Sequence, residues 1–102
     1  MDKEKIIEIL KAYVNALISN RIPVAQAYLF GSTVKGTDNI DSDFDIALFL
    51  KRMQDEISML NQLMKIRREF DLRIEPHPFL ENDIDNGNPL VNNIITTGEK
   101  IY

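Results

Sequence analysis

The chain has no cysteine and no tryptophan, and its 102 residues include only four glycines and four prolines. The absence of cysteine excludes disulfide bonds and thiolate metal sites, and it agrees with a reducing compartment. No apolar run approaches the about 18 residues that a membrane span needs, and the charged N-terminus does not resemble a signal peptide. We therefore expect a cytoplasmic protein.

An excess of positive charge is also missing, because the formal net charge at pH 7 is −4 and the isoelectric point is about 4.9. This balance argues against a domain that holds nucleic acid by neutralising many phosphates. The length and the 44% hydrophobic content predict a single domain over residues 1–102 with a modest core. An active site in so small a domain should be an open cleft, whose other wall comes from the substrate or a partner.

The spacing of apolar residues predicts an alternation of helices and strands. Apolar residues three to four apart predict helices over residues 2–20, 51–69 and 89–98. Short apolar runs predict strands at Ala25–Phe30, Phe44–Leu50 and Asp71–Ile74, and Pro76 and Pro78 are expected to end the last one. The predicted fold class is α+β, a small mixed β-sheet packed with helices.

Two aspartates at the start of the central predicted strand carry the first chemical signal. Asp43 and Asp45 point to the same face of an extended chain, with alpha carbons about 6 to 7 Å apart. Two carboxylates this close repel each other, and apolar neighbours make ionisation harder still. A divalent cation removes this conflict, and paired carboxylates with waters and phosphate oxygens are a usual Mg²⁺ site. The sequence therefore predicts that both aspartates bind Mg²⁺.

Ten residues lie between Asp43 and the pair Gly31-Ser32, which ends the first predicted strand. Gly31 lets a ligand approach the backbone, and the amide and hydroxyl of Ser32 can receive phosphate oxygens. A helical turn is expected over residues 32–35, followed by a loop over residues 36–39. Phosphate donors and metal carboxylates would then face each other across one cleft, which suits phosphoryl or nucleotidyl transfer with two metal ions.

A two-metal site needs a third carboxylate on a neighbouring strand, where it can also take a proton from an attacking hydroxyl. The third predicted strand offers Asp71 and Glu75, which share a face because they are four residues apart. Asp71 is favoured because it opens this strand, whereas Glu75 stands where the strand is expected to end. Arg73 either neutralises Asp71 or contacts a phosphate.

The spacing of these residues resembles the GS-x10-D-x-D signature of the DNA polymerase beta-like nucleotidyltransferase superfamily. Within it, the chain is similar to the minimal nucleotidyltransferase (MNT) group, whose short proteins carry a basic residue and a glycine where Lys35 and Gly36 stand. The stretch FDLRIEP also resembles the strand that supplies the third aspartate of polymerase beta. This resemblance assigns that role to Asp71 and gives Arg73 a counterpart. It covers the chain from Leu29 to about Pro76.

The resemblance implies a Mg²⁺-dependent nucleotidyltransferase, which moves a nucleoside monophosphate from a nucleoside triphosphate, most often ATP, to a hydroxyl and releases pyrophosphate. Two Mg²⁺ ions are expected. The implied catalytic and metal-binding residues are Asp43, Asp45 and Asp71. The implied nucleotide-binding residues are Gly31, Ser32, Lys35 and Arg73.

The resemblance also implies a partner, because MNT proteins are frequently paired with a HEPN-domain protein as antitoxin and toxin. The broad apolar face of the helix predicted over residues 51–69 suits such a contact or a homo-oligomer. An alternative function is a non-catalytic antitoxin or regulatory subunit that occludes a HEPN-type partner. A further alternative is transfer to an aminoglycoside hydroxyl, although enzymes of that kind resemble longer chains.

His77 lies between two prolines and has no companion at the spacing of metal ligands. We therefore expect it to be a turn residue.

Overall fold

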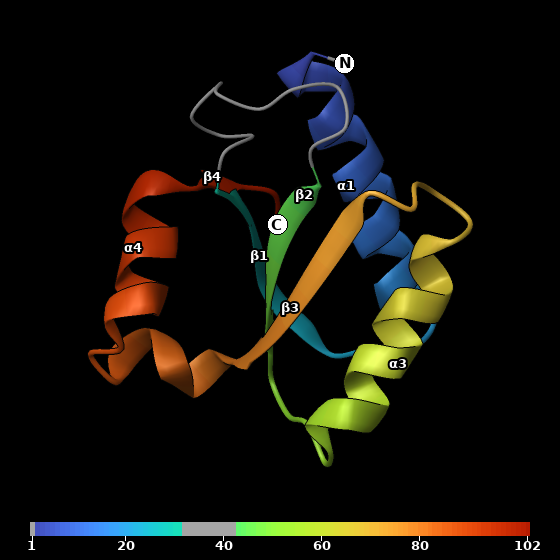
Figure 1. The fold of residues 1–102 in the computed structure, drawn as a ribbon. Helices are drawn as coiled ribbons and strands as arrows, with labels where there is room; N and C mark the ends of the chain where they lie inside the picture. The colour runs from blue at the N-terminus through green and yellow to red at the C-terminus, as the bar shows by residue number, and fades with distance from the viewer. Residues whose placement is uncertain (1, 32–42) are drawn as a thin grey trace.

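The structure, a computed structural model, describes residues 2–31 and 43–102. In this part of the chain, helices pack against both faces of a four-stranded β-sheet (Figure 1). The helices and strands, in chain order, are α1 (Lys3–Ser19), β1 (Val24–Phe30), β2 (Phe44–Leu50), α3 (Glu56–Arg67), β3 (Ile74–Leu80), the 3-10 helix η1 (Glu81–Asp85), α4 (Pro89–Thr97) and β4 (Glu99–Lys100). Two helices, α1 and α3, cover one face of the sheet, and α4 covers the other (Figure 1).

The sheet is mixed, as the sequence predicts, and its strand order is β3-β2-β1-β4. Strand β1 runs antiparallel to both β2 and β4. Strand β2 runs parallel to β3, and α3 makes the crossover that a parallel pair requires. The predicted α+β class is confirmed. This order leaves one side of β3 as an edge of the sheet.

Strand β2 is apolar on both faces because helices cover both faces of the sheet. The face toward α1 and α3 receives Phe44, Ile46, Leu48 and Leu50. The opposite face receives Ala47 and Phe49, which pack with Val91 and Ile94 of α4. The central strand predicted from the sequence is confirmed. Asp45 is the one residue of β2 that is not buried.

Local signals set the start of α1, and a long-range bond holds the helix in place. Asp2 caps the first turn, because its carboxylate accepts a hydrogen bond from the Lys5 amide at 2.9 Å. The buried Tyr13 hydroxyl donates to the Leu63 carbonyl of α3 at 2.8 Å. Burial raises the pKa of Tyr13. This bond ties together the two helices on one face of the sheet.

Helix α3 is shorter than the helix predicted over residues 51–69, and it begins at Glu56. Asp55 sets this start, because its carboxylate accepts hydrogen bonds from two amides of the first turn, both at 3.3 Å. The chain before Asp55 instead continues from β2, where the Lys51 amide donates to the Pro23 carbonyl at 2.9 Å. The apolar period alone did not show this boundary.

Strand β3 differs most from the prediction. The strand predicted at Asp71–Ile74 is wrong in its position, because β3 begins at Ile74 and ends at Leu80. Pro76 and Pro78 lie inside the strand instead of ending it. Prolines are tolerated in a strand at the edge of a sheet, where a missing N–H group need not interrupt the hydrogen-bond ladder.

The backbone bonds of β3 show why its prolines fit. The Phe44 amide of β2 donates to the Arg73 carbonyl at 2.7 Å, so odd-numbered residues here turn their backbone groups toward β2. The Ile74 carbonyl instead accepts from the Arg67 side chain at 2.8 Å. Even-numbered residues therefore face the open edge, and both prolines are even-numbered. The missing N–H groups also make this edge a poor template for pairing with another strand.

Helix α4 begins and ends where the sequence predicts. Asn88 caps it by accepting from the Leu90 amide at 2.9 Å, Pro89 is its first residue, and Gly98 follows its last turn. Across the described ranges, no helix combines the length and the apolar character needed to cross a membrane.

Candidate active site

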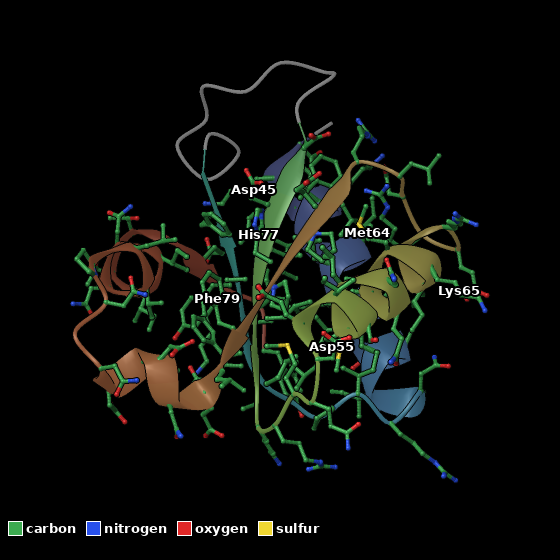
Figure 2. The ribbon with its side chains drawn as sticks, turned by 60° about the horizontal axis from the view of Figure 1, so that its bottom comes forward. Asp45, Asp55, Met64, Lys65, His77 and Phe79 are labelled. Carbon is green, nitrogen blue, oxygen red and sulfur yellow. The ribbon has the colours of Figure 1, made fainter. Side chains whose placement is uncertain are left out.

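Asp45 is the centre of the candidate site because three strands meet around it. It lies on β2 between Phe30 of β1 and Glu75 of β3, its direct partners in the two strand pairings. Alternation along β2 turns its side chain to the α4 face of the sheet, together with Ala47. The side chain is 32% exposed, so a ligand can reach it. Figure 2 shows it close to His77.

Gly31 follows the last residue of β1 and packs closely against Asp45. Its φ angle is +86°, a conformation that favours glycine. A Cβ atom at this position would lie 2.8 Å from Oδ2 of Asp45. The left-handed backbone therefore favours glycine here, and an added Cβ atom would displace the Asp45 carboxylate. Oδ2 of Asp45 therefore points toward Gly31, the first residue of the Gly-Ser pair.

His77 is a residue of the site that sequence reasoning missed. It lies within β3, so the prediction of a turn residue is wrong. Its Nε2 atom is 3.0 Å from Oδ1 of Asp45, and its ring packs edge-on against Phe30 at 5.1 Å between centroids. The available signal was alternation along IEPHPFL, which puts Glu75, His77 and Phe79 on one face of a strand.

Two further carboxylates flank Asp45. Asp43 comes immediately before β2 and is exposed. Glu75 lies directly opposite Asp45 in the pairing of β2 with β3. Because paired residues of neighbouring strands point to the same face, Glu75 and Asp45 share the α4 face of the sheet. Acidic residues thus lie close to the beginnings of two adjacent parallel strands.

Asp71 lies in the turn before β3, outside the strand pairing that contains Asp45. Both of its carboxylate oxygens contact Arg73, with Nε to Oδ1 at 3.1 Å and Nη2 to Oδ2 at 2.9 Å. The Arg73 hydrogen bond holds the pKa of Asp71 below its ordinary value. The Arg73 guanidinium also lies 4.8 Å from the centre of the Phe44 ring, which packs on the face opposite to that of Asp45.

The remaining predicted site residues, Ser32 and Lys35, lie outside the described residues. The helical turn expected over residues 32–35 and the loop expected over residues 36–39 also lie outside them.

The donor chemistry around Asp45 fits a Mg²⁺ site that a substrate completes. Within residues 2–31 and 43–102, no three acidic or histidine side chains are gathered closely enough to hold a metal ion by themselves. Mg²⁺ is usually bound by one or two carboxylates, while waters and substrate phosphates fill the other positions. Asp43 and Asp45 are the residues that would supply the carboxylates of such a shell. The close approach of Gly31 to Oδ2 of Asp45 leaves no room for a side chain between them.

A mixed sheet in which a glycine follows one strand and two aspartates lie around the start of the neighbouring strand is consistent with the nucleotidyltransferase fold. The chain matches the family described as "Polymerase beta, Nucleotidyltransferase" over residues 4–102, and it belongs to this family. The resemblance drawn from the sequence is thereby confirmed.

A solved structure described as "Crystal structure of the toxin-antitoxin with AMP-PNP" contains a chain with a similar fold. The TM-score is 0.65 at 22% sequence identity, and the match covers 90% of this chain and 72% of that one. At this identity the likeness shows the shared fold alone. Comparison with curated proteins finds no match.

Proposed function

We propose that the protein is a Mg²⁺-dependent nucleotidyltransferase that moves a nucleoside monophosphate, AMP from ATP as the first candidate, to a hydroxyl acceptor. The observation that carries this proposal is the position of Asp45. It lies between Gly31, which follows β1, and the acidic residue Glu75 of β3, on an accessible part of the sheet face. Membership of the nucleotidyltransferase family supports the reaction class.

Each carboxylate has a role in this proposal. Asp43 and Asp45 hold Mg²⁺, which when bound neutralises charge on the phosphate oxygens and orients them. Glu75 is the third carboxylate, since it pairs with Asp45 and shares its face. Asp71 is expected in that role from the sequence, but its two engaged oxygens favour a structural ion pair with Arg73.

The proposed reaction balances with the residues of the site. The acceptor oxygen forms a bond to the α-phosphorus, the bond from that phosphorus to the bridging oxygen breaks, and pyrophosphate leaves. Glu75 takes the proton of the acceptor hydroxyl. Gly31, Ser32 and Lys35 are proposed to hold the triphosphate, and this part rests on the sequence motif.

Titration of ATP into the protein, with and without Mg²⁺, tests the site. We expect binding that depends on Mg²⁺ and that is lost in Asp45→Asn, because that change removes a charged oxygen ligand. Asp85→Asn is the matched control, since Asp85 is exposed at the end of η1 and its loss changes the net charge equally. Binding that is unchanged in Asp45→Asn would contradict the assignment.

We further propose that a second protein chain, of HEPN type, is the partner and brings the acceptor. Helix α3 supports a protein contact, because Ile57 is 72% exposed and Leu60 is 37% exposed on it. The structural neighbour described as a toxin-antitoxin supports a protein partner, and the HEPN type comes from the sequence resemblance. The same surface also supports the alternative function, in which the protein neutralises its partner by occlusion without transfer.

The double variant Asp43→Asn with Asp45→Asn separates the two functions. Under the transferase proposal, labelling of an acceptor from [α-32P]ATP disappears while partner binding persists. Under the alternative, the wild type transfers no label and the double variant still neutralises the partner.

A further inference from the structure

We propose that His77 is a positioning residue for Asp45. It holds Oδ1 of the carboxylate, so that Oδ2 stays directed toward Gly31, where the metal and the triphosphate are proposed to bind. This inference rests on the proposed function and adds a residue to it.

The contact between the two side chains defines the direction of the hydrogen bond. Nε2 of His77 lies 3.0 Å from Oδ1 of Asp45, a distance of an ordinary hydrogen bond. An ionised carboxylate has no proton to give and only accepts. In the proposed site, where Asp45 binds the metal as a carboxylate, His77 therefore carries a proton on Nε2 and donates a hydrogen bond to Oδ1.

The two oxygens of Asp45 have different surroundings. Oδ1 contacts His77 of β3. Oδ2 points to the end of β1, where it would lie 2.8 Å from a Cβ atom on Gly31. The terminal torsion of an aspartate is broad, so the backbone alone does not fix the plane of the carboxylate. A hydrogen bond from His77 to Oδ1 fixes the plane of the carboxylate, and it thereby also fixes the direction in which Oδ2 points.

The position of His77 is itself fixed by the sheet. Its direct partner on β2 is Ala47, a fully buried residue with a small side chain, and Asp45 is the diagonal neighbour. Diagonal neighbours on one face of a sheet are within reach of long side chains. The Phe30 ring of β1 packs edge-on against the imidazole and supports it from the other side of Asp45.

A purely structural role predicts different behaviour. The side chains of His77 and Asp45 are 38% and 32% exposed, and contacts between partly exposed charged groups add little to stability. Hydrogen-bond partners of metal-binding carboxylates, in contrast, commonly change metal affinity or activity by about tenfold to a hundredfold when removed. Metal-dependent binding is therefore the property that distinguishes the two roles.

Two substitutions separate the hydrogen bond from ring packing. His77→Phe keeps a ring against Phe30 and removes the donor, whereas His77→Gln keeps an N–H donor and removes the ring. Phe79→Leu is the matched control. Phe79 lies two residues after His77 in the same strand, and its ring stacks on the Phe49 ring. Each variant is assayed for binding of Mn²⁺ with ATP by calorimetry and for its unfolding midpoint.

We expect His77→Phe to weaken Mn²⁺-ATP binding by about tenfold, and His77→Gln and Phe79→Leu to stay within about threefold of the wild type. The unfolding midpoints should stay close to that of the wild type. Equal loss in His77→Phe and His77→Gln, or no loss in either, would overturn the proposal.

A measurement on the protein alone keeps this inference separate from the proposed function. Long-range 1H–15N NMR spectra at pH 8 should show the Nε2–H tautomer of His77, and Asp45→Asn should shift its signal. The Nδ1–H tautomer would overturn the hydrogen bond. Absence of Mn²⁺-ATP binding in the wild type, with the Nε2–H tautomer present, would remove the proposed function and the positioning role with it, while the side-chain contact would stand.

Discussion

At the scale of single residues, the site depends on one close approach between a glycine and a carboxylate. Gly31 has a φ angle of +86°, and a Cβ atom there would meet Oδ2 of Asp45 at 2.8 Å. Gly87 has a similar φ angle of +71°, but a Cβ atom there would meet nothing within 4 Å. The two glycines therefore separate backbone strain from crowding at the site.

We expect Gly87→Ala to lower the free energy of unfolding by about 1 to 2 kcal/mol, the cost of a left-handed conformation, without changing ATP binding. Gly31→Ala should cost about as much stability as Gly87→Ala, because the added Cβ atom meets only the flexible end of the Asp45 side chain. It should in addition weaken Mg²⁺-dependent ATP binding, because the Asp45 carboxylate has to move. Denaturant unfolding and calorimetry measure the two effects. Equal ATP binding in both variants would show that crowding against Asp45 is unimportant.

The choice between Glu75 and Asp71 as third carboxylate also belongs to this scale. We expect Glu75→Gln to reduce transfer by at least about a hundredfold through loss of the base, and Asp71→Asn to leave transfer within about threefold. Asp71→Asn should instead lower the free energy of unfolding by about 1 kcal/mol, because it weakens the pair with Arg73. Single-turnover transfer and denaturant unfolding measure these effects. The reverse pattern would restore the assignment to Asp71.

At the scale of helices and strands, the hydrogen bond from the Tyr13 hydroxyl of α1 to the Leu63 carbonyl of α3 links the two helices directly. Tyr13 is fully buried, and burial raises its pKa, so its hydroxyl stays protonated and donates throughout the neutral range. Its ring also packs edge-on against Phe70 at 6.0 Å between centroids. The contact therefore combines packing and one buried hydrogen bond.

We expect Tyr13→Phe to keep the ring contact and to lower the free energy of unfolding by about 1 kcal/mol, the net value of one hydrogen bond. ATP binding should not change, since α1 and α3 lie on the face opposite to that of Asp45. Tyr102→Phe serves as the control, because Tyr102 is 48% exposed. An equal decrease in the free energy of unfolding in both variants would indicate that the buried hydrogen bond of Tyr13 does not stabilise the fold.

Strand β3 shows the limit of reading elements from sequence. Pro76 and Pro78 are ordinary signs of a strand end, and the sequence offers no local sign that their nitrogens face an open edge. That orientation follows from the pairing of β3 with β2, in which Ile74 lies opposite Phe44, a residue 30 positions earlier in the chain. A local pattern carries no information about such a pairing.

At the scale of the whole molecule, the two faces of the sheet carry different surface features. The face that carries Asp45 holds the candidate site, whereas α3 on the other face has the exposed apolar side chains of Ile57 and Leu60. Leu60 also lines a pocket together with Glu75 and His77, so a partner bound on α3 would lie next to the candidate site. This arrangement is compatible with both proposed functions.

We expect Ile57→Glu to abolish binding of a co-expressed HEPN-type partner while changing the free energy of unfolding by no more than about 0.5 kcal/mol, because the side chain is 72% exposed. Leu90→Glu is the control, since Leu90 is 52% exposed on α4, on the other face. Affinity capture and size-exclusion chromatography with light scattering measure complex formation. Loss of binding only in Leu90→Glu would move the partner to the α4 face.

The sequence by itself determined the features that depend on local spacing. These are helix α1, helix α4 between Asn88 and Gly98, the apolar strand β2, and the α+β class. The family was also readable, because its motif is a matter of residue types at fixed intervals. Hydrophobic period and capping act within a few residues, so a linear sequence displays them.

Only the tertiary structure decided which side chains meet around Asp45. It brought His77 to Oδ1, paired Glu75 with Asp45, and left Asp71 in a turn with Arg73. The contacts of His77 and Glu75 with Asp45 join segments about 30 residues apart through the register of a parallel strand pair. A shift of one residue in this register would turn every side chain of the strand to the other face. Such a register is set by the packing of the whole sheet between its helices, which no short stretch of sequence contains.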